Sequence, residues 1–261
     1  MPDPLARIPF LTGLLFIAAC SREARSPVRQ QSTALLAADA SVPSEPVYDP
    51  CPPAPAQCLI MPLGDSTTAG TDNHGGYRGE LYRLLQATGR PFDFVGSQPA
   101  GGLGSGQEGH PGMHIDNLTG YLELYMTTYK PNVILLLMGV NDVDYMYTAH
   151  IATYGKILDQ ISVLLPQSLV VVGLVTPNTA TVDVTAPHTP TRDVTIAFNA
   201  ALMKEVNTRI AAGKHLMLVD HHSALRSRDI GPDGIHPVPA GYARMAQVWY
   251  SVLSRFMRPK D

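Results

Sequence analysis

The chain has 261 residues, of which 45% are hydrophobic, and its formal net charge is −3 at pH 7. That length suffices for one domain with a full core. The sequence has no cluster of Lys and Arg interleaved with aromatic residues, so we expect no nucleic-acid partner.

The first twenty residues have the pattern of an export signal. The apolar run from Ile8 to Ala19 follows Arg7 and is too short to span a bilayer. It ends in IAAC, which resembles the lipobox of bacterial lipoproteins, where cleavage precedes a cysteine that is then lipidated. We expect residues 1–20 to be a lipoprotein signal peptide, with Cys20 lipidated and the exported protein anchored to the bacterial cell envelope. The alternative is a plain secretory signal and a secreted protein.

The next segment, residues 21–57, is rich in Pro, Ala and Ser and has almost no periodic apolar pattern. Such composition predicts a flexible tether. If Cys20 carries lipid, Cys51 and Cys58 are left as a pair in an oxidising setting, where a disulfide is expected. Two free thiols are the alternative. We place the folded domain at residues 58–261.

Within this domain, short apolar runs alternate with segments of helical periodicity. Strands covered on both faces by helices are apolar throughout, as several of these runs are. The alternation predicts an α/β fold, a three-layer α/β/α sandwich around a five-stranded parallel sheet. The expected strands are 59–63, 92–95, 133–138, 169–175 and 216–219, and the expected helices are 77–85, 115–129, 151–165 and 239–253.

Four loops that follow predicted strands carry reactive or glycine-rich sequences. The carboxyl ends of parallel strands lie at one edge of a sheet, so residues far apart in the sequence can meet there around one crevice. The four loops are Gly64-Asp65-Ser66, Gly109-His110-Pro111-Gly112, Gly139-Val140-Asn141-Asp142 and Asp233-Gly234-Ile235-His236-Pro237.

These loops contain the parts of a serine hydrolase site. A serine hydroxyl becomes nucleophilic when a base takes its proton, and His236 suits that role for Ser66. Asp233 stands three residues before the histidine, where its carboxylate can hold the imidazole and stabilise the imidazolium. Developing negative charge on an ester oxygen needs donors, for which the backbone N–H groups of Ser66 and Gly112 and the amide of Asn141 are the candidates.

The same residues resemble a known family, the SGNH subgroup of the GDSL hydrolases. The matching sequences are GDS at Ser66, HPG at Gly112, GVND at Asn141 and DGIHP at His236, in the order of that family and spanning nearly the whole domain. The resemblance implies a flavodoxin-like SGNH hydrolase fold and a serine esterase with an acyl-enzyme intermediate, without cofactor or metal. Gly109 is an alternative to Gly112 as oxyanion donor.

Within that family, GDSTTAGTDNHGGYRGEL, FDFVGS and GHPGMHI are similar to sequences of carbohydrate-esterase family three. Its described members include acetyl xylan esterases, so the likeness implies removal of O-acetyl groups from a xylan-like polysaccharide. One alternative is an esterase of the same mechanism acting on lipid or acetylated peptidoglycan. Another is a carbohydrate-binding lipoprotein without turnover, which the intact set of Ser66, Asn141, Asp233 and His236 disfavours.

Other polar residues have simpler expected roles. Asp65 and Asp142 are expected to hydrogen-bond local backbone, and Arg78 to be a solvated or ion-paired surface group. The adjacent His221 and His222 raise the possibility of a metal site. Adjacent strand residues point to opposite faces, however, so we expect these histidines to support other site residues or to lie on the surface. His110 and His114 either border the substrate or lie in a plain surface loop, and the 176–192 segment either shapes the cleft or is an insertion without a role.

Overall fold

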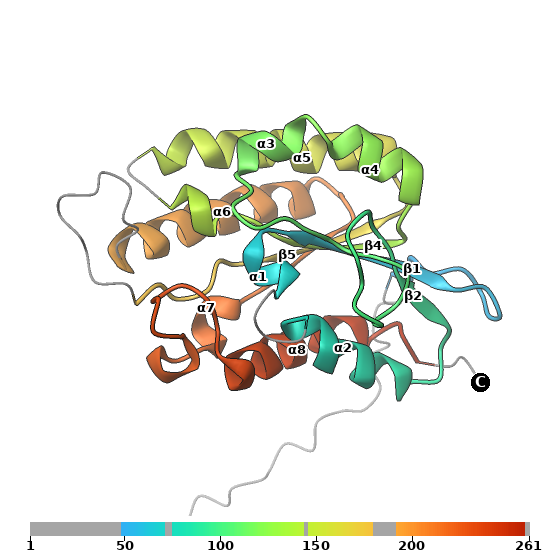
Figure 1. The fold of residues 1–261 in the computed structure, drawn as a ribbon. Helices are drawn as coiled ribbons and strands as arrows, with labels where there is room; N and C mark the ends of the chain where they lie inside the picture. Colours follow the sequence, from blue (N-terminus) through green and yellow to red (C-terminus); the bar gives the residue numbers. More distant parts are fainter. Residues whose placement is uncertain (1–47, 71–74, 144–145, 180–191, 259–261) are drawn as a thin grey trace, which may run out of the picture. The chain divides into compact units, whose positions relative to one another are not determined.

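The computed structural model describes residues 48–70, 75–143, 146–179 and 192–258 (Figure 1). The predicted signal peptide, Cys20 and most of the predicted tether lie outside these residues, as do residues 180–191 of the long loop. None of the described helices is long and apolar enough to cross a membrane.

A parallel sheet forms the middle layer, with strand order β2-β1-β4-β5-β6. The predicted strands are present, and a short β3 adds a sixth by pairing with the end of β1. The sequence analysis missed β3 because it has only two residues and no apolar run. The strands are β1 (Cys58–Gly64), β2 (Phe92–Phe94), β3 (Glu108–Gly109), β4 (Val133–Leu137), β5 (Leu169–Gly173) and β6 (Leu216–Val219).

Helices cover both faces of the sheet, which confirms the predicted three-layer sandwich (Figure 1). One face carries α3 (Ile115–Thr119), α4 (Leu122–Tyr129), α5 (Tyr147–Leu164) and α6 (Arg192–Ala211). The other carries α2 (Tyr77–Gln86), α7 (His221–Ala224) and α8 (Pro239–Leu253). The short elements at loops are α1 (Ser66–Ala69) and the 3₁₀ helices η1 (Val140–Asp142) and η2 (Ser227–Asp229).

The central strand β4 shows why the apolar runs lack alternation. All five of its residues are buried, with Ile134 and Leu136 in the core under α3 to α6. Val133, Leu135 and Leu137 face the other core, under α2 and α8. Successive side chains point to opposite faces of a strand, so a sheet covered on both sides needs apolar residues at every position.

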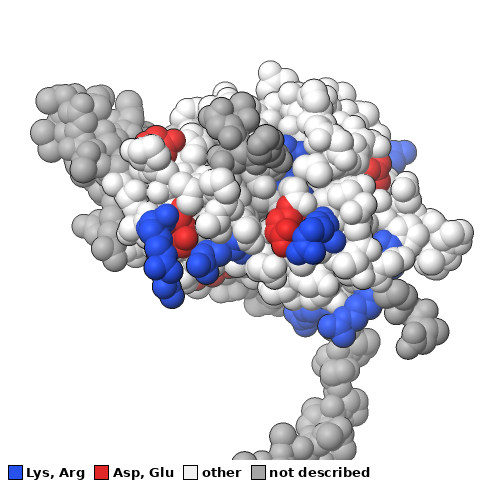
Figure 2. All heavy atoms as spheres, turned by 60° about the horizontal axis from the view of Figure 1, so that its bottom comes forward, with Lys and Arg blue, Asp and Glu red and all other residues white. Residues whose placement is uncertain are grey.

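The charged side chains on the α2 and α8 face include local pairs. Arg83 binds Glu80 at 2.6 Å, and Arg244 binds Asp229 at 3.3 Å. Figure 2 shows basic and acidic side chains adjoining on this face. The exposed Arg83–Glu80 pair contributes little to stability, whereas Asp229 is buried.

Residues 48–57, which the sequence analysis placed in the tether, pack against the domain. Cys51 and Cys58 form a disulfide. The buried Arg90 guanidinium donates to the Asp49 carboxylate at 3.0 Å, to the Pro52 carbonyl at 3.1 Å and to the Cys51 carbonyl at 3.2 Å. The folded domain therefore begins before Cys58, and the boundary set from composition alone lies too late in the chain.

Candidate active site

Ser66 lies at the carboxyl end of β1, on the first residue of α1 (Figure 1). The turn between them is tight: a Cβ at Gly64 would overlap the Leu137 carbonyl oxygen and the Thr68 hydroxyl. Asp65 caps α1 by accepting the Thr67 N–H at 2.9 Å. The glycine and the cap together explain why GDS is needed where the strand turns into a helix.

Ser66, His236 and Asp233 form a continuous hydrogen-bonded chain. The Ser66 Oγ lies 2.7 Å from His236 Nε2, and His236 Nδ1 lies 2.6 Å from Asp233 Oδ2. The serine and the histidine are 170 residues apart in the sequence. The sheet edge thus brings together the three residues that the sequence analysis selected as nucleophile, base and supporting carboxylate.

A β-turn sets the position of Asp233. Gly234 N donates to Gly231 O at 3.0 Å, with Pro232 and Asp233 at the middle of the turn, and Gly234 has a φ of 75°. Asp233 Oδ1 accepts the N–H groups of Ile235 at 2.9 Å and His236 at 3.0 Å. Burial raises the pKa of Asp233, but these hydrogen bonds and the one from the imidazole outweigh it, so the pKa lies below its ordinary value.

Gly112 lies in a second turn that faces this edge. Met113 N donates to His110 O at 3.0 Å, Pro111 occupies the second turn position, and Gly112 occupies the third with a φ of 76°. These are the features of a type II turn, which requires a positive φ at that position. His110 N donates to Gly64 O at 2.9 Å and so ties the turn to the end of β1.

The structure separates the two glycines considered as oxyanion donors. The N–H of Gly109 donates to Gln107 Oε1, and Gly109 is buried within β3. Gly112 is an exposed residue, and its N–H makes no backbone hydrogen bond among the described residues. Asn141 lies in η1, and its amide donates to Met113 O at 3.0 Å, which brings it to the residue after Gly112.

Residues 63–244 match the model of the GDSL-like lipase/acylhydrolase family. The chain belongs to this family. It is 28% identical over 232 residues to a multidomain esterase of Ruminococcus flavefaciens, across 77% of this chain and 29% of that protein. The chain therefore spans less than a third of that relative.

Solved structures of family 3 carbohydrate esterases have the same fold. The one from Clostridium thermocellum is 29% identical, with a TM-score of 0.65 over 77% of this chain and 98% of that one. The one from Talaromyces cellulolyticus is 20% identical, with a TM-score of 0.64 over 77% of this chain and 98% of that one. Because its sequence identity is low, it supports the fold alone. The resemblance to the SGNH hydrolases is confirmed, and the chain contains a GDSL-family domain of the serine ester hydrolase type.

Asp65 makes the local backbone contact expected of it, whereas Asp142 binds backbone 27 residues away and not the local backbone expected. Asp65 caps α1, and Asp142 accepts the Ile115 N–H at 3.2 Å with both carboxylate oxygens. Both side chains are buried. Burial raises the pKa of Asp65 to about 6, and burial also raises that of Asp142.

The buried Asp65 carboxyl gives the fold a measurable pH dependence. Its pKa of about 6 in the folded chain exceeds the unfolded value of about 4, so the folded state binds the proton more tightly. The stability from Asp65 is therefore present below about pH 4 and is lost as the pH rises through about 6.

Asp65→Asn keeps the oxygen that caps α1 but cannot ionise. Between about pH 4 and 7 we expect the wild-type free energy of unfolding to fall by roughly 2–3 kcal/mol relative to the variant. Denaturant unfolding of both proteins across this range measures the difference, since other groups titrate alike in the two chains. Parallel curves would contradict the buried ionisation of Asp65.

Arg78 is buried, so the expected surface position is wrong. Its guanidinium donates to the carbonyls of Thr68 at 2.9 Å and Ala69 at 2.8 Å, and to Ala100 at 3.4 Å. The last carbonyls of a helix have no intrahelical partner. In this family member, Arg78 therefore supports the end of the helix that carries Ser66, a role that no motif signalled.

His221 is a core residue, not a support for other site residues and not a surface group as expected. It has no exposed area, and its ring meets the edge of Trp249 with centroids 4.5 Å apart. Burial lowers its pKa to about 3, so the ring is neutral. Among the described residues, no group of three or more His, Cys, Asp or Glu side chains could hold a metal ion.

The remaining loop residues contact neighbours of the site. His110 Nε2 lies 2.7 Å from the buried Glu108 carboxylate and 3.2 Å from the Tyr125 hydroxyl. At the start of the long loop, Thr179 N donates to Gly234 O at 2.8 Å, next to Asp233. The described part of this loop therefore supports the turn that holds the aspartate.

Proposed function

We propose that this GDSL-family hydrolase removes O-acetyl groups from a polysaccharide through an acyl-enzyme intermediate, with Ser66 as nucleophile. The observation that carries the proposal is the unbroken chain of hydrogen bonds from Ser66 through His236 to Asp233. A base at 2.7 Å from the hydroxyl is within the reach that proton abstraction requires.

In the acylation step, Ser66 Oγ attacks the acetyl carbonyl carbon while its proton moves to His236 Nε2. The carbonyl oxygen becomes an anion that the N–H groups of Ser66 and Gly112 and the Asn141 amide stabilise. When the tetrahedral intermediate collapses, the bond to the sugar oxygen breaks and the imidazolium protonates that oxygen. Asp233, ionised because its pKa is lowered, stabilises the imidazolium in between.

In the deacylation step, a water molecule gives its proton to His236 Nε2 and attacks the acetyl-serine. The same donors bind the second oxyanion, and acetate leaves as the proton returns to Ser66 Oγ. Both steps need the same geometry, so one imidazole serves as base and then as acid in each.

The polysaccharide substrate is inferred from relatives and from the loops at the sheet edge. The similarity to a protein described as a family 3 carbohydrate esterase supports a carbohydrate ester. The 100–114 segment is polar and glycine-rich, and none of the described loops at this edge is apolar enough to line a long acyl tunnel. Binding energy should therefore come from the sugar side, which favours a short acyl group.

Acyl length and substrate source test this proposal together. On a series of 4-nitrophenyl esters we expect the acetate to react fastest and kcat/KM to drop steeply by the octanoate. Acetate release from acetylated xylan, pectin, chitooligosaccharide and peptidoglycan then identifies the natural class. An octanoate that reacts as fast as the acetate indicates a lipid esterase, release from peptidoglycan alone indicates that substrate, and no turnover of any ester indicates a binding protein.

Chelators should have no effect on these rates, because the serine supplies the nucleophile.

We also propose that lipid on Cys20 anchors the exported protein. Cys20→Ser removes the lipid acceptor, and the remaining Pro/Ala/Ser-rich segment is too polar to hold a membrane. We expect the full-length protein to move from the membrane fraction to the soluble exported fraction in cell fractionation. A wild-type protein that is already soluble, or a variant that stays anchored, contradicts the lipoprotein assignment.

A further inference from the structure

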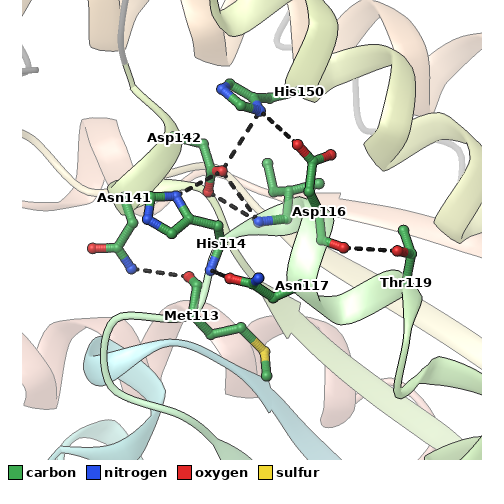
Figure 3. A network of polar contacts seen from close by, with 9 residues as sticks. Met113, His114, Asp116, Asn117, Thr119, Asn141, Asp142 and His150 are labelled. Carbon is green, nitrogen blue, oxygen red and sulfur yellow. Dashed lines mark hydrogen bonds and ion pairs between the residues drawn. The ribbon is translucent and has the colours of Figure 1, made fainter.

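Asp142 joins three separate elements beside the site (Figure 3). Its carboxylate accepts the Ile115 N–H at 3.2 Å and lies 3.2 Å from His114 Nδ1, both at the start of α3. It also lies 3.7 Å from His150 Nδ1, on α5. One fully buried carboxylate in η1 therefore holds the start of one helix and meets a second.

The neighbouring Asn141 makes a parallel contact to the same segment. Its amide donates to Met113 O at 3.0 Å, as Figure 3 shows. Met113 to Ile115 directly follow Gly112. Asn141 and Asp142, which are adjacent in η1, therefore both bind the chain just after the turn that contains Gly112. Two of the three proposed oxyanion donors thus belong to segments that these contacts hold together.

We propose that Asp142 is a positioning residue of the oxyanion hole: it fixes the distance between the Gly112 N–H and the Asn141 amide. This inference rests on the proposed function, since it needs both groups to bind the oxyanion. The geometry favours it because Gly112 is exposed, and the other contacts that hold its turn lie at His110, before Gly112: its N–H donates to Gly64 O at 2.9 Å and its ring meets Glu108 at 2.7 Å. Donors act on an oxyanion only when they are held in place before the reaction.

The replacement Asp142→Asn changes this support without changing the size of the side chain. An amide oxygen at the Oδ1 position can still accept from Ile115 N and His114 Nδ1, but at the Oδ2 position the NH₂ group, itself a donor, replaces the oxygen that accepts the Ile115 N–H at 3.2 Å and disturbs this contact. With 4-nitrophenyl acetate we expect kcat to fall on the order of ten- to a hundredfold, as small misplacements of reacting groups do. KM should change little, because the donors act on the transition state.

Asp116→Asn is the matched control. Asp116 is an exposed carboxylate of the same cluster that meets His150 at 3.6 Å and makes no described side-chain contact with the Gly112 turn. Removing its charge should leave kcat within about twofold of wild type. A large effect of this control would mean that charge, rather than the position of the turn, matters, and would overturn the inference.

A double-mutant cycle with Asn141→Ala separates positioning from general damage. If Asp142 acts through the oxyanion donors, Asp142→Asn should cost less than about threefold in the Asn141→Ala background. Equal losses in both backgrounds, or a folded Asp142→Asn variant with wild-type kcat, would overturn the inference. A normal kcat for Asn141→Ala itself would remove the oxyanion role from the proposed function, and the inference with it.

Because Asp142 is buried, its replacement could unfold the chain, so circular dichroism and Tm accompany each assay. His114→Ala provides a second route, since this half-exposed side chain can be removed without opening the core. We expect a severalfold loss of kcat that also shrinks in the Asn141→Ala background. A rise in KM with unchanged kcat would instead make His114 a substrate contact and count against positioning.

Discussion

Ser66→Ala is expected to lower kcat on 4-nitrophenyl acetate by on the order of 10⁴-fold or more while leaving Tm near the wild-type value. The substitution removes one oxygen, whose described hydrogen bond is the 2.7 Å contact with His236 Nε2. The backbone N–H of residue 66, the Asp65 cap and the turn at Gly64 all remain. What is lost is the proposed nucleophile of the acyl-enzyme step.

The matched control is Ser251→Ala, which removes an exposed hydroxyl on α8 that donates only to Val248 O. Its kcat should equal that of the wild type. Mass spectrometry under acid quench provides a second readout, since an acetyl group on residue 66 should accumulate in the wild type and not in Ser66→Ala. Substantial esterase activity in the Ser66→Ala variant would defeat the assignment of the nucleophile.

The strands could be predicted because burial on both faces requires an apolar residue at nearly every position of a strand. β4 and β5 are buried at every position, so their apolar runs are uninterrupted. Helix α6 was missed for the opposite reason. Its buried face mixes Phe198 and Leu202 with the polar Asn199, and Ile196 and Met203 are exposed on the outside, so the periodicity is blurred.

The residues of the candidate site could be selected because the parallel sheet brings separate motifs to one edge. The positions of the residues that surround the site could not be predicted from the sequence. Arg78 and His221 carry polar side chains that are usually exposed, and only the packing of other segments buries them. Asn199 shows the same effect: its amide binds both the N–H and the carbonyl of Val175, a pairing that no local pattern reveals.

Removal of the proposed base, His236, is the second large effect that we expect. His236→Ala should lower kcat/KM by on the order of 10⁴-fold or more, because without an imidazole the hydroxyl of Ser66 keeps its proton. Wild-type kcat/KM should fall toward acidic pH, since a protonated imidazole cannot accept that proton. Asp233 does not contribute to this loss of activity at acidic pH, because its lowered pKa keeps it ionised across the range of about pH 5 to 8.

The pH profile of the variant distinguishes a base from a merely structural histidine. If His236 is the base, the residual activity of His236→Ala should lose the fall toward acidic pH that the wild type shows, since the imidazole that accepts the proton is gone. His222→Ala, on a partly exposed histidine of α7, serves as control and should keep the wild-type profile. A fall toward acidic pH that persists in His236→Ala/Asp65→Asn, where the Asp65 carboxyl with its pKa of about 6 is also removed, would mean that another group accepts the proton of Ser66. In that case the 2.7 Å contact between Ser66 Oγ and His236 Nε2 would orient the serine without activating it.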